Sequence, residues 1–281
     1  MFTLKKSKLA VMLALVLVAA VFAAGCAGSS EKGEENASGV SGTVKVAGST
    51  SVQPLSEELS EVFMDEYPDV TISVTGGGSS AGVEAANTGT ANIGASSREI
   101  KEEEKSYGLT ETVIAKDGIA VVVNAENPAA DLTLEQVKKI FTGEITNWSE
   151  IGGADKPITV VVREEGSGTR GAFEEIVLGD ARFIANAIIQ NSTGAIKNAV
   201  ISDPYAVGFI SMGSVDTSVK AVKVDGVEAT GENVTNGSYK ISRPFLYLTK
   251  GEPDAATKAF IEFVLSEEGQ QIVAEEFIPA K

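Results

Sequence analysis

One stretch constrains the fold more than any other, because it joins an apolar strand, a glycine–hydroxyl turn and a helix without interruption. Residues 160–163 read Val-Val-Val-Arg, and Gly166-Ser167-Gly168-Thr169 follow after two glutamates. Apolar residues then recur at helical spacing as far as Val177. The first N–H groups of a helix have no partner inside it, and the helix dipole favours negative charge there. With its two hydroxyls and Arg163, this stretch predicts a cradle for a small oxyanion.

Similar turns occur three more times in the chain. Gly48–Ser51 follows a short apolar strand pattern, and Gly78–Ser80 follows another; each precedes a helical pattern. Ser96–Arg98 follows a third strand pattern. A single glycine–serine turn is common in ordinary loops, so one alone would carry little weight. Four such turns in one chain, together with Arg163, favour an oxyanion site.

Strand and helix patterns alternate along the chain, which is typical of an α/β fold. We expect mixed, mainly parallel sheets with the ligand turns at the carboxyl ends of strands. Thr133 and Gln136 form a capping box before a helix that Gly143 ends. Asp254 is expected to cap one final helix, residues 183–190 are expected to be helical, and residues 219–224 are expected to form a strand.

The composition excludes several function classes. The net charge is −16 and histidine is absent, so the chain has no histidine-based triad, general base or metal ligand. Basic residues do not cluster beyond the N-terminus, which argues against a nucleic-acid partner. Gly78–Gly82 matches the nucleophile elbow of hydrolases, but Ser80 lacks a histidine base. We therefore expect a binding protein rather than an enzyme, with no cofactor and no metal.

The N-terminus resembles a lipoprotein signal peptide. Three lysines precede an apolar run from Leu9 to Ala24, and Gly25-Cys26 follow. Cleavage after residue 25 would leave Cys26 as the lipid attachment site, with residues 26–42 as a flexible polar tether. The alternative is an uncleaved membrane anchor, although the apolar run is shorter than the ~20 residues that a span needs. We expect a lipid-anchored protein on the extracytoplasmic face of the cell membrane.

The turns and their neighbours resemble the phosphate-specific substrate-binding proteins of ABC importers, over about residues 43–281. The segments that carry the resemblance are Ala47–Leu55, Gly76–Gly82, Ile93–Glu99, Phe141–Gly143, Ile145–Trp148, Arg163–Arg170 and Ala206–Ser211.

The resemblance implies a two-lobed fold of the periplasmic-binding-protein type (type II, a Venus flytrap). Lobe one would comprise residues 43–120 and 245–281, and lobe two residues 121–244. Two crossings, near residues 118–124 and 242–246, would form the hinge.

The resemblance also implies a phosphate site and the protein's partners. The expected ligands are Thr50, Ser51, Ser79, Ser97, Arg163, Ser167, Gly168 and Thr169. Ser97 stands where the best-known members have an aspartate that accepts the proton of HPO₄²⁻. Arg98 could reach the anion or pair with a neighbouring acid. The protein would be a monomer that delivers phosphate to the membrane subunits of an ABC importer. The alternatives are a binder of sulfate, molybdate or tungstate, and a surface adhesion or sensor lipoprotein on the same fold.

Overall fold

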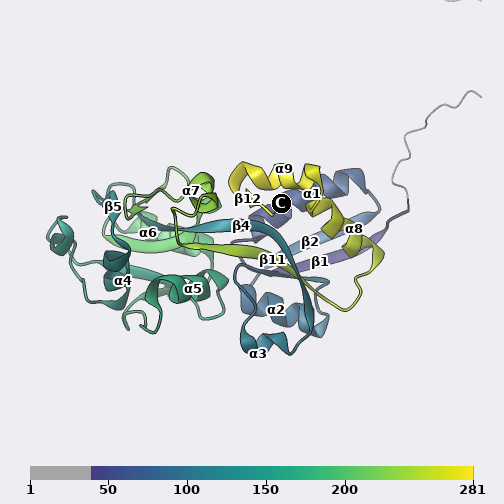
Figure 1. Cartoon of the computed structure of the whole chain (residues 1–281), viewed down its shortest axis with the longest axis horizontal. Coiled ribbons are helices and arrows are strands. Elements are labelled where there is room, and N and C mark those ends of the chain that lie inside the picture. Colours follow the sequence, from purple (N-terminus) through teal and green to yellow (C-terminus); the bar gives the residue numbers. More distant parts are fainter. Residues whose placement is uncertain (1–38, 281) are drawn as a thin grey trace, which may run out of the picture. The chain divides into compact units, whose positions relative to one another are not determined.

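The computed structural model describes residues 39–280, which contain a mixed ten-stranded sheet (Figure 1). Eight of its strands follow the order β2-β1-β3-β11-β4-β8-β6-β7, while β9 and β12 pair with β4. A separate small sheet joins β5 and β10. The strands are β1 (Gly42–Gly48), β2 (Val70–Gly76), β3 (Ile93–Ser96), β4 (Leu109–Asn124), β5 (Asp131–Leu132), β6 (Thr159–Arg163), β7 (Ile188–Gln190), β8 (Ala206–Ser211), β9 (Val219–Ala221), β10 (Lys223–Val224), β11 (Ser242–Lys250) and β12 (Ile278–Pro279).

Helices connect most of these strands. They are α1 (Gln53–Glu66), α2 (Ser79–Thr88), α3 (Glu102–Lys105), α4 (Leu134–Thr142), α5 (Gly168–Phe173), α6 (Thr193–Ser202), α7 (Gly231–Thr235), α8 (Ala255–Val264) and α9 (Glu267–Glu276). The chain continues from α5 into a π-helical segment, Glu174–Leu178, and short 3₁₀ helices span Trp148–Ile151 and Met212–Ser214.

Two long antiparallel strands, β4 and β11, run side by side through the middle of the sheet (Figure 1). Strand β4 contributes to two separate hydrophobic cores. The first core contains Ile114 and Ala115 of β4, and the second contains Ile119, Val121 and Val123 of the same strand. The other large members of the first core include Leu59, Phe63, Phe245, Tyr247 and Phe260; those of the second include Phe141, Trp148, Phe173, Phe209 and Ile241.

Parallel pairings lie on both sides of these central strands, as the alternating pattern predicts. Strand β1 pairs in parallel with β2 and β3, and β6 pairs in parallel with β7 and β8. The α/β class with a mixed sheet is therefore confirmed. One detail differs from the expected sheet in each lobe, because β4 contributes to both cores and β11 pairs with it in the opposite direction. They add antiparallel pairings and join the two halves into one sheet.

The predicted helix ends agree with the structure. Thr133 Oγ1 accepts from the Gln136 N–H, and Gly143 ends α4 with a φ of 84°, in the left-handed region that favours glycine. Asp254 Oδ1 accepts from the Thr257 N–H at the start of α8. These caps satisfy backbone N–H groups that a helix leaves without partners.

Three expectations about local structure were wrong. Residues 183–190 are not a helix: the last three form β7, where the β-branched Ile188 and Ile189 pair with β6. The expected final helix is two helices, because Ser266 caps a new one, α9, with its hydroxyl accepting from the Gly269 N–H. The expected strand 219–224 is divided at Val222 into β9 and β10.

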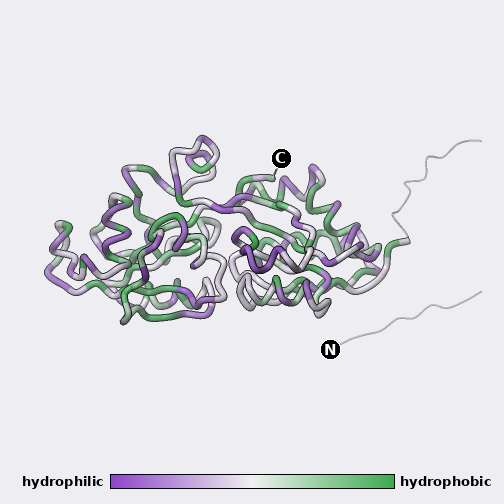
Figure 2. Tube along the Cα trace, turned by 60° about the horizontal axis from the view of Figure 1, so that its bottom comes forward, coloured by the Kyte–Doolittle hydropathy of each residue, from purple (hydrophilic) through white to green (hydrophobic). Residues whose placement is uncertain are grey.

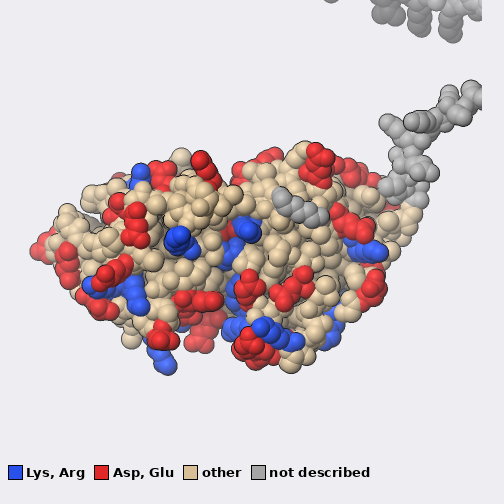
Figure 3. All heavy atoms as spheres, viewed as in Figure 1, with Lys and Arg blue, Asp and Glu red and all other residues tan. Residues whose placement is uncertain are grey.

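Hydrophobic and hydrophilic stretches alternate along the described part of the trace (Figure 2). Acidic side chains are spread over the visible face with basic ones between them, as the net charge of −16 leads one to expect (Figure 3). No helix among residues 39–280 has the length and apolar character needed to cross a bilayer. Cys26, the signal peptide and most of the tether lie outside the described residues.

Candidate anion-binding site

Three of the four predicted turns lead directly into helices: the first (Gly48–Ser51), the second (Gly78–Ser80) and the third (Gly166–Thr169). The fourth turn is Ser96–Arg98. Helix α1 begins at Gln53 after the first turn, α2 begins at Ser79 within the second, and α5 begins at Gly168 within the third. Small residues are required where these turns pack together. A Cβ on Gly168 would lie 2.2 Å from Ser79 Oγ and 2.7 Å from Ser97 Oγ. The sequence therefore lets the α5 turn approach the second and fourth turns closely.

Hydroxyls from three chain segments meet in one group. Ser51 Oγ, in the first turn, lies 2.9 Å from Thr169 Oγ1 at the start of α5. The same Ser51 Oγ lies 3.2 Å from Thr193 Oγ1 at the start of α6. Thr50 Oγ1 lies 3.4 Å from Thr193 Oγ1 and accepts from the Thr193 N–H at 3.3 Å. These residues come from positions up to 143 apart in the chain, so the fold itself assembles the group.

A second group of hydroxyls adjoins the first. Ser97 Oγ accepts from Ser49 Oγ at 2.8 Å and lies 3.4 Å from Ser79 Oγ. Ser79 Oγ also accepts from the Ser97 N–H at 3.0 Å. The two groups share the first turn, where the Ser51 N–H donates to Ser49 Oγ. Ser49, Ser51, Ser79, Ser97 and Thr169 are each at most 3% exposed. We call these five residues, with Thr50 and Thr193, the hydroxyl cluster.

Arg163 brings positive charge to the hydroxyl cluster. It ends β6 and is 2% exposed. Its Nε and Nη2 donate to the two carboxylate oxygens of Glu164, each at 2.8 Å, while Nη1 donates to Thr193 Oγ1 at 3.3 Å. The Nη1 group therefore faces the hydroxyls. A Cβ on Gly78 would lie 3.2 Å from Glu164 Oε1, so this carboxylate borders the turn before α2.

Two other arginines contact the turns but are held by buried carboxylates. Arg98 donates to both oxygens of Glu104 at 2.7 Å and to Ser80 Oγ at 3.2 Å. Burial alone would raise the pKa of Glu104, but hydrogen bonds from Arg98 and the Lys101 N–H outweigh it and lower that pKa below 4.5. Of the two alternatives for Arg98, its geometry favours pairing with a neighbouring acid over contact with the anion.

Arg243 forms the other buried pair, across the two central strands. Its Nε and Nη2 donate to Asp117 Oδ2 at 3.1 and 2.9 Å, and its Nη1 donates to the Ser97 carbonyl at 3.2 Å. The Ser211 hydroxyl, at the end of β8, donates to Asp117 Oδ1 at 2.8 Å. Asp117 lies between the β4 residues of the first core and those of the second. This pair therefore connects the point between the cores with the Ser97 turn.

Most of the residues expected from the sequence lie together. Thr50, Ser51, Ser79, Ser97, Gly168 and Thr169 make the contacts given above, and Arg163 joins them through Thr193. Ser167 has a structural task as well, because its hydroxyl caps α5 by accepting from the Arg170 N–H at 3.2 Å. Whether each residue touches a ligand stays a prediction.

Sequence reasoning missed three residues that belong to this arrangement: Ser49, Glu164 and Thr193. Ser49 lies inside the turn Gly48–Ser51, and Glu164 lies between Arg163 and the turn Gly166–Thr169. For Thr193 a signal was present, because Ser192-Thr193-Gly194 precedes Ile196 and Val200 at helical spacing.

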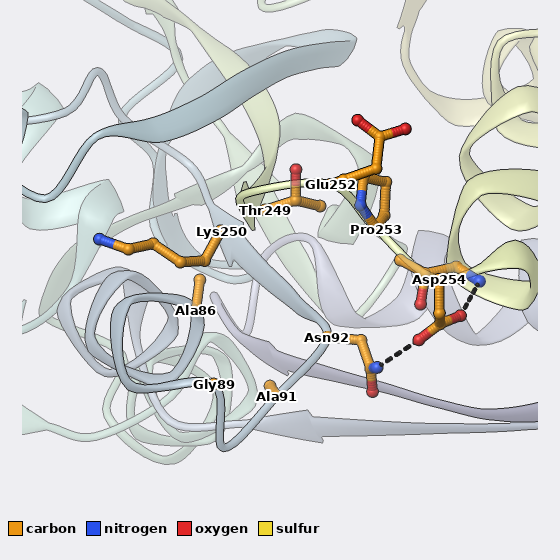
Figure 4. A pocket seen from close by; sticks show the side chains of 10 residues that line it. Ala86, Gly89, Ala91, Asn92, Thr249, Lys250, Glu252, Pro253 and Asp254 are labelled. Carbon is orange, nitrogen blue, oxygen red and sulfur yellow. Dashed lines mark hydrogen bonds between the residues drawn. The ribbon is translucent and has the colours of Figure 1, made fainter.

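The cavity in Figure 4 is a different place. It has a volume of about 170 Å³ and lies between the end of α2 and the start of α8. The side chain of Asn92 donates to Asp254 at 3.0 Å there, and Thr257 Oγ1, in the cavity lining, has no hydrogen-bond partner among the described residues. It shares no residue with the hydroxyl cluster. Within residues 39–280 no three potential metal-ligating side chains gather in one group.

The hydroxyl cluster has the chemistry of a site for a small anion. Hydroxyls and helix-opening N–H groups donate hydrogen bonds, and Arg163 adds a positive charge. Few charges are present, so an anion would be held mainly by many short hydrogen bonds in a buried place. A carboxylate suited to general acid–base work beside an activated nucleophile is not part of the cluster.

Comparison with known proteins agrees with this chemistry. Residues 33–268 match the family model of the PBP superfamily domain. Among curated proteins, the phosphate-binding protein PstS of Bacillus subtilis (strain 168) is 36% identical over 283 residues, covering 96% of this chain and 92% of that protein. PstS of Pseudomonas aeruginosa (strain PAO1) is 33% identical, with 87% and 85% covered.

Solved structures give the same result. A putative phosphate ABC transporter substrate-binding protein from Clostridium perfringens, with bound phosphate, is 52% identical with a TM-score of 0.84, covering 85% of this chain and 100% of that one. An ABC-type phosphate transport receptor from Vibrio cholerae is 38% identical with a TM-score of 0.70, at the same coverage. Both the family model and the relatives thus cover most of the chain. The chain belongs to the PstS family of phosphate-binding proteins, within the PBP superfamily.

Proposed function

We propose that the protein binds inorganic phosphate in the hydroxyl cluster and delivers it to an ABC importer. The observation that carries this proposal is the meeting of Ser51 with Thr169, at 2.9 Å, and of Gly168 with Ser79 and Ser97. Turns from distant parts of the chain thereby face each other with hydrogen-bond donors. The relatives named above are phosphate-binding proteins, one of them with phosphate bound.

The ligands proposed from the sequence divide between two lobes. Lobe one, residues 43–120 and 245–281, would supply Thr50, Ser51, Ser79 and Ser97. Lobe two, residues 121–244, would supply Arg163, Ser167, Gly168 and Thr169. Strand β4 contributes to both cores, and β11 follows directly after Ile241 of the second core and contributes Phe245 and Tyr247 to the first. The segments 118–124 and 242–246 would therefore act as the hinge.

Closure has a physical cause in this scheme. The Ser80 N–H donates to the Gly166 carbonyl at 3.0 Å, so the second and third turns are in contact in this structure. A phosphate between the turns would gain bonds from both lobes, which an open form could not offer together. Hydrogen bonds to a charged group contribute roughly 1.5–3 kcal/mol each. Several of them, less the costs of desolvation and closure, reach the ~8 kcal/mol of micromolar binding.

Attachment to the membrane is part of the proposal. Cleavage after residue 25 and lipidation of Cys26 would hold a monomer at the extracytoplasmic face of the membrane, with residues 26–42 as tether. Mass spectrometry of the protein purified from membranes should find the N-terminal peptide beginning at a diacylated Cys26. An unmodified peptide that contains residues 1–25 would contradict the anchor.

A competition titration tests the binding function and its selectivity. Calorimetry should give a micromolar or tighter Kd for phosphate, with sulfate and molybdate competing only weakly. Sulfate carries no proton, so a site with acceptor oxygens disfavours it; here a serine, Ser97, stands in the place of a carboxylate. Equal competition by sulfate would assign the protein to the wider class of tetrahedral oxyanion binders. Absence of any heat with all three anions would refute the proposed site.

A further inference from the structure

We propose that Thr193 is a further phosphate ligand and that Arg163 polarises its hydroxyl. This inference rests on the proposed function and deepens it, because it adds a residue from a helix that the expected ligand set did not include. Thr193 is the first residue of α6 and is 6% exposed. Its hydroxyl lies within 3.5 Å of three members of the site, Thr50, Ser51 and Arg163.

The direction of one hydrogen bond fixes what the Thr193 hydroxyl can do. A guanidinium has donors only, so in the 3.3 Å contact with Arg163 Nη1 the threonine oxygen must accept. The single hydrogen of that hydroxyl is then left to point elsewhere. Its other near neighbours are Ser51 Oγ at 3.2 Å and Thr50 Oγ1 at 3.4 Å. Either oxygen can be the donor in these two contacts, so the hydrogen of the Thr193 hydroxyl is available to the hydroxyl cluster and to an anion bound there.

The charge of Arg163 makes this donor stronger than an ordinary hydroxyl. Chains of hydrogen bonds polarise one another, and the effect is larger where the surroundings exclude water. Glu164 occupies Nε and part of Nη2, so Nη1 is the group that faces Thr193. Part of the guanidinium charge would thus reach the anion through Thr193.

The backbone at Thr193 adds a second contribution. Ser192 caps α6, its hydroxyl accepting from the Ala195 N–H at 3.1 Å. The Thr193 N–H has no acceptor inside the helix, and it donates instead to Thr50 Oγ1 at 3.3 Å. The ten-residue helix α6 therefore directs the positive end of its dipole towards the cluster.

Thr193 also lies at the boundary between the hydroxyl cluster and a groove. The groove has a volume of about 410 Å³, and Thr50, Thr193, Lys197 and Asp216 are among its lining residues. Of these, Thr50 and Thr193 belong to the hydroxyl cluster as well. These two residues therefore border the cluster on the side of the groove.

The test compares two replacements at this position with a matched control. Thr193→Val keeps the shape and removes the hydroxyl, whereas Thr193→Ser keeps the hydroxyl. Thr235→Val is the control, because Thr235 is exposed in α7 and has no contact with the cluster. Calorimetry with inorganic phosphate should show that Thr193→Val raises Kd about tenfold or more. Thr193→Ser and Thr235→Val should stay within about threefold of the wild type.

A double-mutant cycle separates a ligand role from a structural one. If Thr193 acts through Arg163, the loss from Thr193→Val should be much smaller in an Arg163→Ala background than in the wild type. Wild-type affinity in Thr193→Val would overturn the inference while leaving the proposed function intact. Equal losses in Thr193→Ser and Thr193→Val, with lowered melting temperatures, would also overturn it, because packing would then be the cause. A wild-type protein that takes up no phosphate would overturn both proposals.

Discussion

Beside the first core and at the point between the two cores, two arginines that contact the turns are each held by a buried carboxylate. Arg98 pairs with Glu104, whose side chain is 9% exposed, and Arg243 pairs with Asp117, which is fully buried. On the side of the second core, Arg163 pairs with Glu164, whose side chain is 28% exposed, and its Nη1 still faces the hydroxyl cluster. The same residue type therefore has two uses within one site.

This difference indicates how a protein of net charge −16 can hold an anion. The buried pairs neutralise Arg98 and Arg243, so these residues position the Ser80 and Ser97 turns without presenting a free charge. The first-core side would offer neutral hydroxyls and N–H groups, and the second-core side would offer one cation. Distant acidic residues matter less, because salt screens exposed charges beyond roughly 8 Å at physiological ionic strength.

The largest effect is expected on the stability of the fold, from breaking the buried pair of Arg243 and Asp117. Asp117→Asn leaves Arg243 as a buried charge with no counter-ion, and such a change costs about 3–5 kcal/mol of folding free energy. Urea unfolding measures it. The phosphate affinity of the folded protein should change less than in Arg163→Ala, because the pair lies behind the Ser97 turn.

The exposed pair of Glu135 and Lys139 provides a matched control for that measurement. Its members are 73% and 40% exposed in their side chains, and Glu135→Gln should leave the unfolding midpoint unchanged. Wild-type stability in Asp117→Asn would show that the buried pair contributes nothing to the fold.

A smaller effect, on phosphate binding instead of folding, is expected from replacing Arg163. Arg163→Ala removes a positive charge that faces the hydroxyl cluster through Thr193. The free energy of phosphate binding should weaken by about 2–3 kcal/mol, which is roughly a 30- to 150-fold rise in Kd. Calorimetry measures it, with the exposed Arg182→Ala as a control that makes the same change in net charge. A near-native Kd would remove Arg163 from the site.

Much of this arrangement could be predicted from sequence, because the turns are local. The residues that open α1, α2 and α5 are encoded within a few positions by glycines, hydroxyls and an apolar helical pattern that follows. The capping box of Thr133 and Gln136 is local in the same way. Such features need no knowledge of what lies across the molecule.

The features that were not predicted from the sequence depend on partners that are distant in the chain. Residues 188–190 became strand β7 because β6 offers them an edge, and a short apolar run alone does not reveal this. The place of Thr193 is set by contacts with Thr50 and Ser51, which are more than 140 positions away. The carboxylate partners of the three arginines likewise could not be assigned in advance, since many acids are available in this chain.

The smallest effect expected is on the pair of Arg98 and Glu104, and it should depend on pH. The folded-state pKa of Glu104 is lowered, so the ionised carboxylate stabilises the fold above the unfolded pKa of about 4.5. That contribution is lost as the pH falls through the folded pKa. Glu104→Gln keeps one acceptor for Arg98 but removes the charge, and at pH 7 it should cost about 1.5 kcal/mol of folding free energy. The difference between wild type and variant should shrink as the pH falls below about 4.5, whereas Glu103→Gln, on the same helix with a side chain 73% exposed, should show no such trend. A pH-independent difference would mean that packing, and not the charge of Glu104, holds Arg98 away from the anion.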